Sequence, residues 1–229
     1  MSNKPSAIIF DLDGTLVDSA RDLSAALNHV LIQAGRPEIP LSRVRNMVGN
    51  GAKAMIVKGF SETGDLPDGQ ELEAILQDFL DYYAENVTRR TVIFPGALDV
   101  IKKLVDQGIP LGLCTNKALK LTEKLITEIG LSNYFTTIVG GDSFDYCKPD
   151  PRHITSTVER MNCPVNRAIM VGDSANDVLA AKAAGMPVIC VSFGYSQTPI
   201  PDLEPDYILD HYDDFFKALT EVSKGFQDF

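Results

Sequence analysis

The chain has 229 residues, of which 45% are hydrophobic and 23% are charged, as in a soluble globular protein with one large domain or one domain carrying an insertion. Its 21 lysine and arginine residues are outnumbered by 31 aspartate and glutamate residues, which gives a net charge of −10 and argues against nucleic-acid and anionic-membrane partners. The four cysteines form no CxxC pair, no apolar run is long enough for a membrane span, and the N-terminus shows no signal-peptide pattern, so we expect a cytoplasmic protein.

Short apolar runs that end in turn residues recur along the chain and predict strands buried on both faces, as in a parallel sheet. Apolar residues at helical spacing separate these runs, over 98–105, 121–129, 154–161 and 178–183. In the last of these segments we expect Val178, Leu179 and Ala183 to form the apolar stripe. This alternation predicts an α/β fold with a doubly wound parallel sheet. The predicted strands are Ala7–Phe10, Pro110–Cys114, Thr137–Val139, Ala168–Val171, Val188–Val191 and Tyr207–Leu209.

The interval between Thr15 and Ile93 shows no strand pattern and is filled by helical patterns with glycine-rich breaks. A βαβ crossover needs far fewer residues than this interval contains. We therefore predict an all-helical insertion over 19–85, within an α/β core formed by 1–18 and 86–229. Because the insertion leaves the core just after the first strand, where α/β folds bind ligands, we expect it to act as a lid, or cap.

Two acidic residues, Asp11 and Asp13, directly follow the first predicted strand, and Gly14 permits a sharp turn after them. A polar turn that caps the strand is the simplest alternative to a functional role. A calcium-binding EF-hand loop does not fit, because it requires glycine at its sixth position and glutamate at its twelfth. Those positions hold Leu16 and Asp22.

Three further polar motifs follow later predicted strands: Thr115-Asn116-Lys117, Lys148-Pro149 and the segment 172–177 (GDSAND). A helix N-cap, a solvated lysine and an acidic first helical turn explain them individually. All the motifs nevertheless lie at carboxyl ends of strands in one α/β domain, and such ends converge on one crevice. Together they supply carboxylates, hydroxyl and amide donors and a cation, a set that can bind Mg²⁺ and a phosphate.

The order DLDGT, TN, KP and GDSAND resembles the haloacid dehalogenase (HAD) superfamily of aspartyl-phosphate phosphatases, and the helical insertion resembles that superfamily's C1 cap. The resemblance covers essentially the whole chain and implies a Rossmann-like HAD core. Four further stretches look most like the phosphoglycolate phosphatase branch: VGNGA (48–52), IFPGA (93–97), CKPDP (147–151) and SFGYS (192–196). This branch implies a small phosphorylated metabolite as substrate, with 2-phosphoglycolate as the best candidate, in a monomer or homodimer that serves carbohydrate metabolism.

The resemblance also implies a covalent mechanism, in which Asp11 is the nucleophile and Asp13 is the general acid and base. Mg²⁺ would bind the carboxylates of Asp11 and Asp173 and the backbone carbonyl of Asp13. Asp177 would act behind these ligands, orienting a water or Lys148.

Phosphate binding is implied for the Thr115 hydroxyl and the Asn116 backbone N–H, with Lys148 balancing charge. Gly14 and Thr15 would add donors from the turn. In the cap, the loop Gly49-Asn50-Gly51 is expected to approach the substrate, although a plain helix–helix turn explains it equally well. Arg45 and Lys53 lie beside this loop and could contact a substrate carboxylate. A solvated position on the protein surface is the simpler interpretation of both residues.

Other functions stay open from the residues. A phosphosugar mutase or phosphatase like β-phosphoglucomutase, or a pyrophosphatase, would use the same core. A phosphate-sensing interaction module is a third possibility, and the intact set Asp11, Asp13, Lys148 and Asp173 argues against it. A phosphonoacetaldehyde hydrolase with Lys53 as its Schiff base and a metal-independent haloacid dehalogenase are disfavoured, because both usually lack an acidic residue at the position of Asp13.

Overall fold

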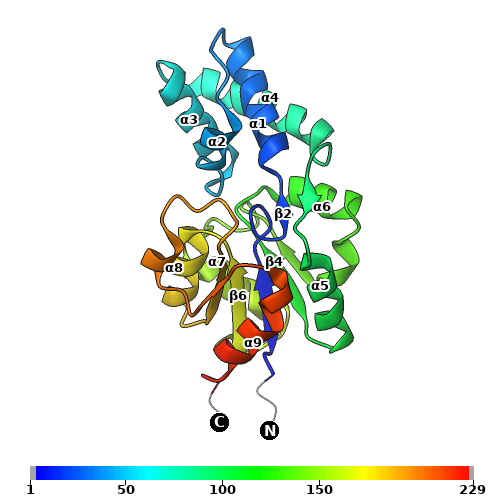
Figure 1. Cartoon of the computed structure of the whole chain (residues 1–229). Coiled ribbons are helices and arrows are strands. Elements are labelled where there is room, and N and C mark those ends of the chain that lie inside the picture. The colour runs from blue at the N-terminus through cyan, green and yellow to red at the C-terminus, as the bar shows by residue number, and fades with distance from the viewer. Residues whose placement is uncertain (1–3, 227–229) are drawn as a thin grey trace.

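The computed structural model describes residues 4–226 and contains a six-stranded parallel sheet with helices on both faces (Figure 1). From the central strand the chain moves outward on one side, returns to the other side of that strand and moves outward again. The strand order is β5-β4-β1-β6-β7-β8. Each predicted strand is present, so the predicted doubly wound fold is confirmed. The bounds are β1 Ala7–Phe10, β4 Leu111–Cys114, β5 Thr137–Val139, β6 Ala168–Gly172, β7 Val188–Val191 and β8 Tyr207–Leu209.

The central strand β1 is buried on both faces because its alternate side chains enter two separate hydrophobic cores. Ile8 and Phe10 pack in the core that includes residues of α5, α6 and α9, whereas Ala7 and Ile9 pack with α7 and α8. Complete burial of a side chain such as Phe10 contributes roughly 1.5–3 kcal/mol. The core helices are α5 Ala97–Asp106, α6 Leu119–Glu128, α7 Pro151–Arg160, α8 Ala175–Ala183 and α9 Phe215–Ser223.

Several helices begin at residues that cap them. Asp150 accepts a hydrogen bond from the backbone N–H of Arg152 at 2.9 Å, and Pro151 occupies the first turn of α7, where its missing N–H costs little. In the same way, Asp68 accepts a hydrogen bond from the backbone N–H of Glu71 at the start of α4. These contacts satisfy backbone donors that have no partner inside the helix.

The apolar stripe expected on α8 was wrong. Leu179 is 52% exposed, and Ala183 is also exposed, whereas Ala180 and Ala181 join Val178 in the core. A helix composed largely of alanine has little hydrophobic contrast between its faces. The rotation of α8 about its own axis is therefore set by how closely its small side chains allow the helix to approach the sheet.

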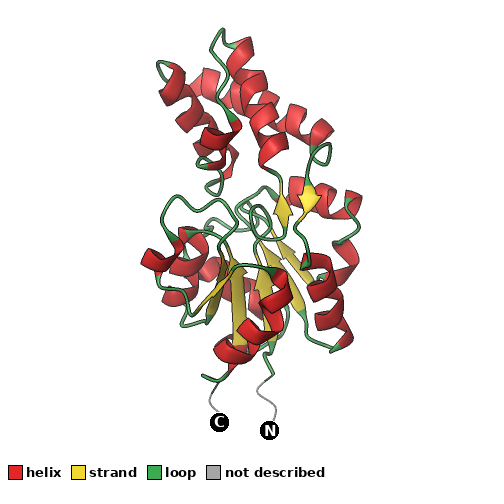
Figure 2. Cartoon of the chain, viewed as in Figure 1, coloured by secondary structure: helices red, strands yellow, loops and turns green. Residues whose placement is uncertain are grey.

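The segment between β1 and α5 forms a helical layer above the carboxyl end of the sheet (Figures 1 and 2). Two short connectors lead into it and out of it, β2 (Val17–Asp18) and β3 (Val92–Ile93), and they pair in antiparallel fashion. The expectation that this interval contains no strand was therefore wrong, because two-residue strands are too short to produce an alternating pattern. The boundary at 19–85 stays a prediction. The helices are α1 Ala20–Gln33, α2 Leu41–Arg45, α3 Gly51–Thr63 and α4 Gly69–Asn86.

Over residues 4–226, no helix combines the length and the apolar composition that crossing a membrane requires.

Candidate active site

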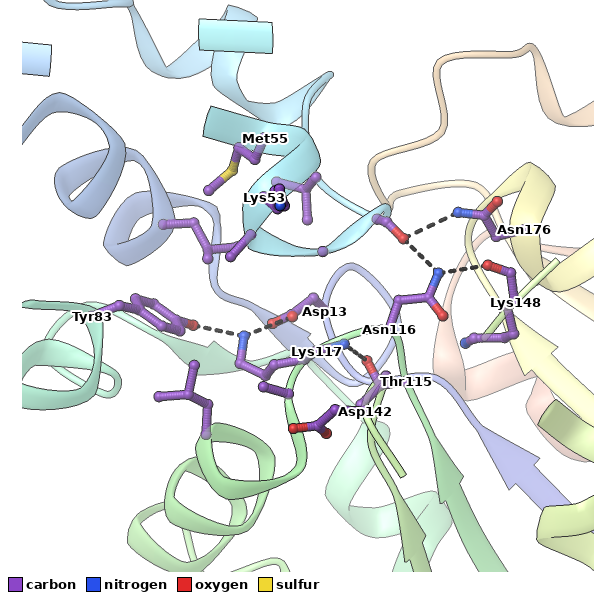
Figure 3. A pocket seen from close by; sticks show the side chains of 18 of the residues that line it. Asp13, Lys53, Met55, Tyr83, Thr115, Asn116, Lys117, Asp142, Lys148 and Asn176 are labelled. Atoms are coloured by element: carbon purple, nitrogen blue, oxygen red, sulfur yellow. Dashed lines mark hydrogen bonds and ion pairs between the residues drawn. The ribbon is translucent and has the colours of Figure 1, made fainter. Parts of the chain in front are cut away.

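A cavity of about 240 Å³ lies between the carboxyl end of the sheet and the helical cap. The core contributes Asp11, Thr115 and Lys148 to its wall, and the cap contributes apolar side chains above them (Figure 3). The chain reverses its direction of winding around β1, so the loops after β1, β4 and β6 all open at this point. The predicted convergence of the motifs on one crevice is therefore observed.

Lys148 is the central cation of the site and is only 3% exposed. Its Nζ donates hydrogen bonds to Asp11 Oδ1 at 2.8 Å, to Asp177 Oδ1 at 2.6 Å and to the Cys114 carbonyl oxygen at 2.6 Å. Burial by itself lowers the pKa of Lys148, but the charges of Asp11 and Asp177 outweigh it and raise the pKa above its usual value. Lys148 is therefore a fixed positive charge with all three N–H donors in use.

Three buried carboxylates surround this lysine, and one oxygen from each of Asp11, Asp173 and Asp177 lies within 4.8 Å of the others. Burial raises the pKa of Asp11 to about 6, with Lys148 opposing the shift and Asp177 adding to it. Burial, together with the charges of Asp177 and Asp11, also raises the pKa of Asp173 well above its usual value. One lysine does not neutralise three carboxylates, and a divalent cation with a preference for oxygen ligands fits this donor set.

Asp177 is held in place on both of its oxygens. Oδ1 accepts from Lys148, and Oδ2 accepts from the backbone N–H and the hydroxyl of Ser174 at the start of α8. Ser174 in turn caps the helix, which forms a reciprocal capping box. Asp177 thus holds Lys148 in place, and its role behind the metal ligands stays a prediction.

Asp173 receives its contacts from two different loops. Its Oδ2 accepts from the backbone N–H of Tyr195 at 2.6 Å, and its Oδ1 accepts from the Thr15 hydroxyl at 3.4 Å. Tyr195 belongs to the SFGYS stretch, and the sequence alone assigned it no role in the site. The signal available was its position in the loop just after β7, next to the β6 loop that carries Asp173.

The turn after β1 depends on Gly14, whose φ of +88° suits glycine. A Cβ at Gly14 would lie 2.3 Å from Asp173 Oδ2, so any other residue would push this carboxylate away. The backbone N–H groups of Gly14 and Thr15 donate within the turn, to the carbonyls of Val17 and Leu12. In this structure the two residues therefore shape the loop, and their N–H groups do not provide the phosphate donors that we expected.

The Thr115-Asn116 motif connects the core to the cap. The Thr115 hydroxyl is buried and accepts from the backbone N–H of Lys117 at 3.3 Å. The Asn116 side-chain amide donates to the carbonyl of Lys148 at 2.8 Å and to the carbonyl of Gly49, in the cap, at 3.0 Å. Asn116 therefore fixes the loop that carries Lys148 and also the loop that covers the site.

The glycine-containing cap loop lies directly on the core. The carbonyl of Gly49 also accepts from Asn176 Nδ2 at 3.1 Å, and the same Nδ2 donates to Asn50 Oδ1 at 2.8 Å. Gly49 and Gly51 line the cavity with φ values of +110° and +81°, whereas Asn50 is exposed. Of the three predicted cap residues, Gly49 and Gly51 therefore face the cavity, and Gly49 and Asn50 hold the cap to the core.

The side chain of Asp13 points toward the cap and is held by two hydrogen bonds. Its Oδ1 accepts from the Ser19 hydroxyl, and its Oδ2 accepts from Lys117 Nζ at 2.7 Å. Lys117 Nζ also donates to the hydroxyl of Tyr83, on cap helix α4, at 2.8 Å (Figure 3). Sequence reasoning missed Lys117 and Tyr83. For Lys117 the signal was present, since it directly follows Thr115 and Asn116 at a strand end.

Arg45 and Lys53, the two basic residues that flank the cap loop in the sequence, lie in different surroundings. Arg45 Nη2 pairs with Asp18 Oδ2 at 2.7 Å and is absent from the cavity wall among the described residues. Lys53 lines the cavity, but its side chain is 55% exposed and pairs with Glu73 at 2.5 Å.

His153 lies against the loop that carries Lys148 and is fully buried. Its Nδ1 is 3.2 Å from the backbone nitrogen of Lys148, and its Nε2 is 3.1 Å from the carbonyl oxygen of Gly140. A neutral ring with the proton on Nε2 satisfies both contacts. Burial, with help from the positive charge of Lys148, lowers the pKa of His153 to about 4.

Comparison with known proteins places this geometry in a family. The family model for haloacid dehalogenase-like hydrolases matches residues 8–191. A phosphoglycolate phosphatase from Agrobacterium fabrum is 41% identical over 231 aligned positions, covering 98% of each chain. The phosphoglycolate phosphatase of Caulobacter vibrioides is 40% identical and covers 95% of this chain and 92% of its own.

Solved structures agree with the sequence relatives. The crystal structure of a predicted phosphoglycolate phosphatase from Haemophilus somnus superposes with a TM-score of 0.89 and 30% identity, covering 95% of this chain and 98% of the other. These matches extend over the core and the cap together. The chain belongs to the haloacid dehalogenase-like hydrolase family.

Proposed function

We propose that the protein is a Mg²⁺-dependent phosphatase of small phosphomonoesters, with 2-phosphoglycolate as the best candidate substrate. The observation that carries this proposal is the position of Asp11 at the end of β1, paired with Lys148 and next to Asp173, at the base of a cavity closed by the cap. The relatives that are 40–41% identical over nearly the whole chain are phosphoglycolate phosphatases, and their reaction is the natural candidate here.

In the proposed reaction, Asp11 attacks the phosphorus atom and the bond from phosphorus to the ester oxygen breaks. Asp13 gives its proton to the departing alkoxide, which leaves as an alcohol. A water then attacks the phosphorus of the aspartyl-phosphate while Asp13 takes a proton from it, and phosphate and free Asp11 are regenerated. The phosphoryl group thus passes to water, and Asp13 ends the cycle protonated as it began.

The residues around the phosphoryl group balance its charge and fix its position. We assign Mg²⁺ to the carboxylates of Asp11 and Asp173 and the backbone carbonyl of Asp13. When bound, the metal neutralises negative charge on the phosphoryl oxygens. Lys148 supplies a further positive charge, and the Thr115 hydroxyl and the Asn116 backbone N–H are the proposed phosphate donors. Asp177 keeps Lys148 in position.

The proposed cap, residues 19–85, excludes bulk water from the site and limits the size of the substrate. Several cap side chains above Asp13 are apolar, so a polar or charged leaving group depends on the polar residues of the core wall for its partners. A cavity of about 240 Å³ also favours a small leaving group. The limited size of the cavity therefore supports phosphoglycolate over the phosphosugar alternative. The apolar cap residues in the cavity wall are Leu23, Val48, Ala52, Met55, Leu76, Phe79 and Leu80.

The proposal is tested by measuring kcat/KM for 2-phosphoglycolate, a hexose phosphate, a nucleoside monophosphate and pyrophosphate, each with Mg²⁺ and with EDTA. We expect 2-phosphoglycolate to be the best substrate and EDTA to abolish turnover. If pyrophosphate or the hexose phosphate is preferred, the substrate assignment is wrong although the enzyme class stands. Full activity in EDTA would remove the metal from the mechanism.

A cytoplasmic location and a monomeric or homodimeric state stay predictions.

A further inference from the structure

Lys117 is a buried cation at the boundary between core and cap, and its side chain is only 5% exposed. Its Nζ lies 2.7 Å from Asp13 Oδ2 and 2.8 Å from the Tyr83 hydroxyl, as Figure 3 shows. An ammonium group carries three N–H donors, and within the described residues these two hydrogen bonds use two of them. One donor remains, on a charged group in the cavity wall that also lies 4.6 Å from the centroid of the Tyr83 ring.

Leu121 and Ala118 from the core and Phe79 and Leu80 from the cap line the same cavity. Asp13 already balances the charge of Lys117, but a remaining N–H donor is costly to leave without an acceptor in a wall of this kind. An anionic group on the substrate is an acceptor of the required kind.

The other two lysines of the cavity are less suited to bind a substrate group. Within the described residues, the cations that line the cavity are Lys53, Lys117 and Lys148. Lys148 has given all its donors to Asp11, Asp177 and the Cys114 carbonyl. Lys53 is half exposed and paired with Glu73, so water screens its charge.

We propose that Lys117 is a specificity residue that binds a carboxylate on the carbon next to the phosphate ester, so that the site selects phosphate esters of small 2-hydroxy acids. This inference rests on the proposed function, because it takes Asp13 as the group that contacts the ester oxygen. In such an ester the carboxylate carbon is two bonds from the ester oxygen. An ester oxygen that contacts Asp13 therefore brings the carboxylate beside the ammonium group already bound to Asp13.

The position of Lys117 also explains how a molecule with net charge −10 accepts a substrate that carries both a phosphate and a carboxylate. Lys148 stands on the phosphate side of the cavity, and Lys117 stands on the side of the leaving group. The two cations are contributed by different loops, after β5 and after β4. Each anionic group of the substrate thus has its own counter-charge.

The test compares 2-phosphoglycolate with ethyl phosphate, which has the same chain length and lacks the carboxylate. The quantity measured is the ratio of their kcat/KM values, in the wild type, in Lys117→Met and in the matched control Lys53→Met. We expect the wild type to prefer 2-phosphoglycolate and Lys117→Met to lower the ratio by about 10- to 100-fold, as expected for loss of a charge-assisted hydrogen bond. Lys53→Met should keep the ratio, and Lys117→Arg should restore part of it.

The outcomes separate this inference from the proposed function. If the wild type hydrolyses neither ester, the proposed function fails. If it hydrolyses both and Lys117→Met lowers the two kcat/KM values equally, Lys117 acts only by holding Asp13, and the specificity inference is overturned.

Because Lys117 is buried, a second measurement uses the wild type alone. Glycolate should inhibit the hydrolysis of ethyl phosphate competitively, whereas ethylene glycol, of similar size and without charge, should not. Equal inhibition by the two compounds would contradict a carboxylate site.

Discussion

Lys148 Nζ lies 2.8 Å from Asp11 Oδ1, and this ion pair joins two buried residues that are 137 positions apart in the chain. The lysine belongs to the loop before α7, and the aspartate follows β1. The pair orients Asp11 and keeps a positive charge beside it. The first two predictions concern its two members.

Replacing Asp11 with asparagine should abolish turnover and leave the fold intact. The amide has nearly the shape of the carboxylate but cannot form the aspartyl-phosphate, so kcat should fall by at least about 10³-fold. The loss of one of three crowded carboxylates offsets part of the weakened pairing with Lys148. Steady-state kinetics and thermal unfolding measure the two effects. A variant with near-wild-type turnover would mean that the nucleophile is misassigned.

Replacing Lys148 with methionine should destabilise the protein strongly. Asp11 and Asp177 would remain buried without their counter-charge, and breaking a buried pair in this way typically costs about 3–5 kcal/mol. The matched control is Lys124→Met, which removes a surface pair with Glu128 and should cost less than about 1 kcal/mol. Urea unfolding of both variants gives the comparison, and equal losses would contradict the structural role of Lys148.

His153 should make stability depend on pH in a defined window. Burial lowers the pKa of His153 from its ordinary value of 6.5 to about 4 in the folded protein. Between these values the unfolded chain binds the proton and the folded protein does not. The neutral ring therefore makes its full contribution to the free energy of unfolding above pH 6.5. This contribution decreases as the pH falls from 6.5 to 4, and below pH 4 it changes no further.

A His153→Gln variant isolates this effect from that of the carboxylates, because the side-chain amide of glutamine can still donate to the Gly140 carbonyl and does not titrate. The unfolding free energy of the wild type relative to the variant should drop by about 3 kcal/mol between pH 6.5 and pH 4. Chemical denaturation at several pH values measures the difference. A difference that is independent of pH would show that His153 is protonated equally in both states.

Mg²⁺ should stabilise the protein independently of catalysis. A cation bound only by the folded state raises the thermal midpoint as its concentration increases, and here it would also relieve repulsion among Asp11, Asp173 and Asp177. We expect Asp173→Asn to abolish most of this increase and Asp142→Asn, at another acidic position in the cavity wall, to preserve it. Calorimetric scans with and without Mg²⁺ measure it. An equal increase in all three proteins would place the bound cation elsewhere.

The contact between Asn176 and the cap loop should help to keep the cap on the core. Asn176→Ala removes the hydrogen bonds to Gly49 and Asn50, each of which is worth about 1 kcal/mol, so KM should rise by about 5- to 50-fold. The matched control is Asn133→Ala, at a solvent-exposed position of the α/β domain, and it should leave KM unchanged. If KM is the same in both variants, these hydrogen bonds do not control closure.

Much of the fold could be predicted from local patterns, since apolar runs bounded by turns predict buried strands wherever they occur. β1, β6 and β7 are such runs and appear where expected, because their burial on both faces leaves a continuous apolar signal. The β2–β3 pair and the rotation of α8 could not be predicted. Two residues are too few to show a period, and alanine-rich helices show little contrast between faces.

The sequence by itself determined the motif set, because a strand end followed by acidic or polar residues is a local property and the resemblance to a family follows from motif order. Only the tertiary structure decided the contacts of those motifs. Lys117 and Asp13 are 104 positions apart, and the Tyr83 hydroxyl that completes their arrangement comes from the cap. Such a contact depends on how the cap helix packs over the strand end. That packing is determined jointly by all the side chains between the helix and the strand, and a local sequence pattern does not contain this information.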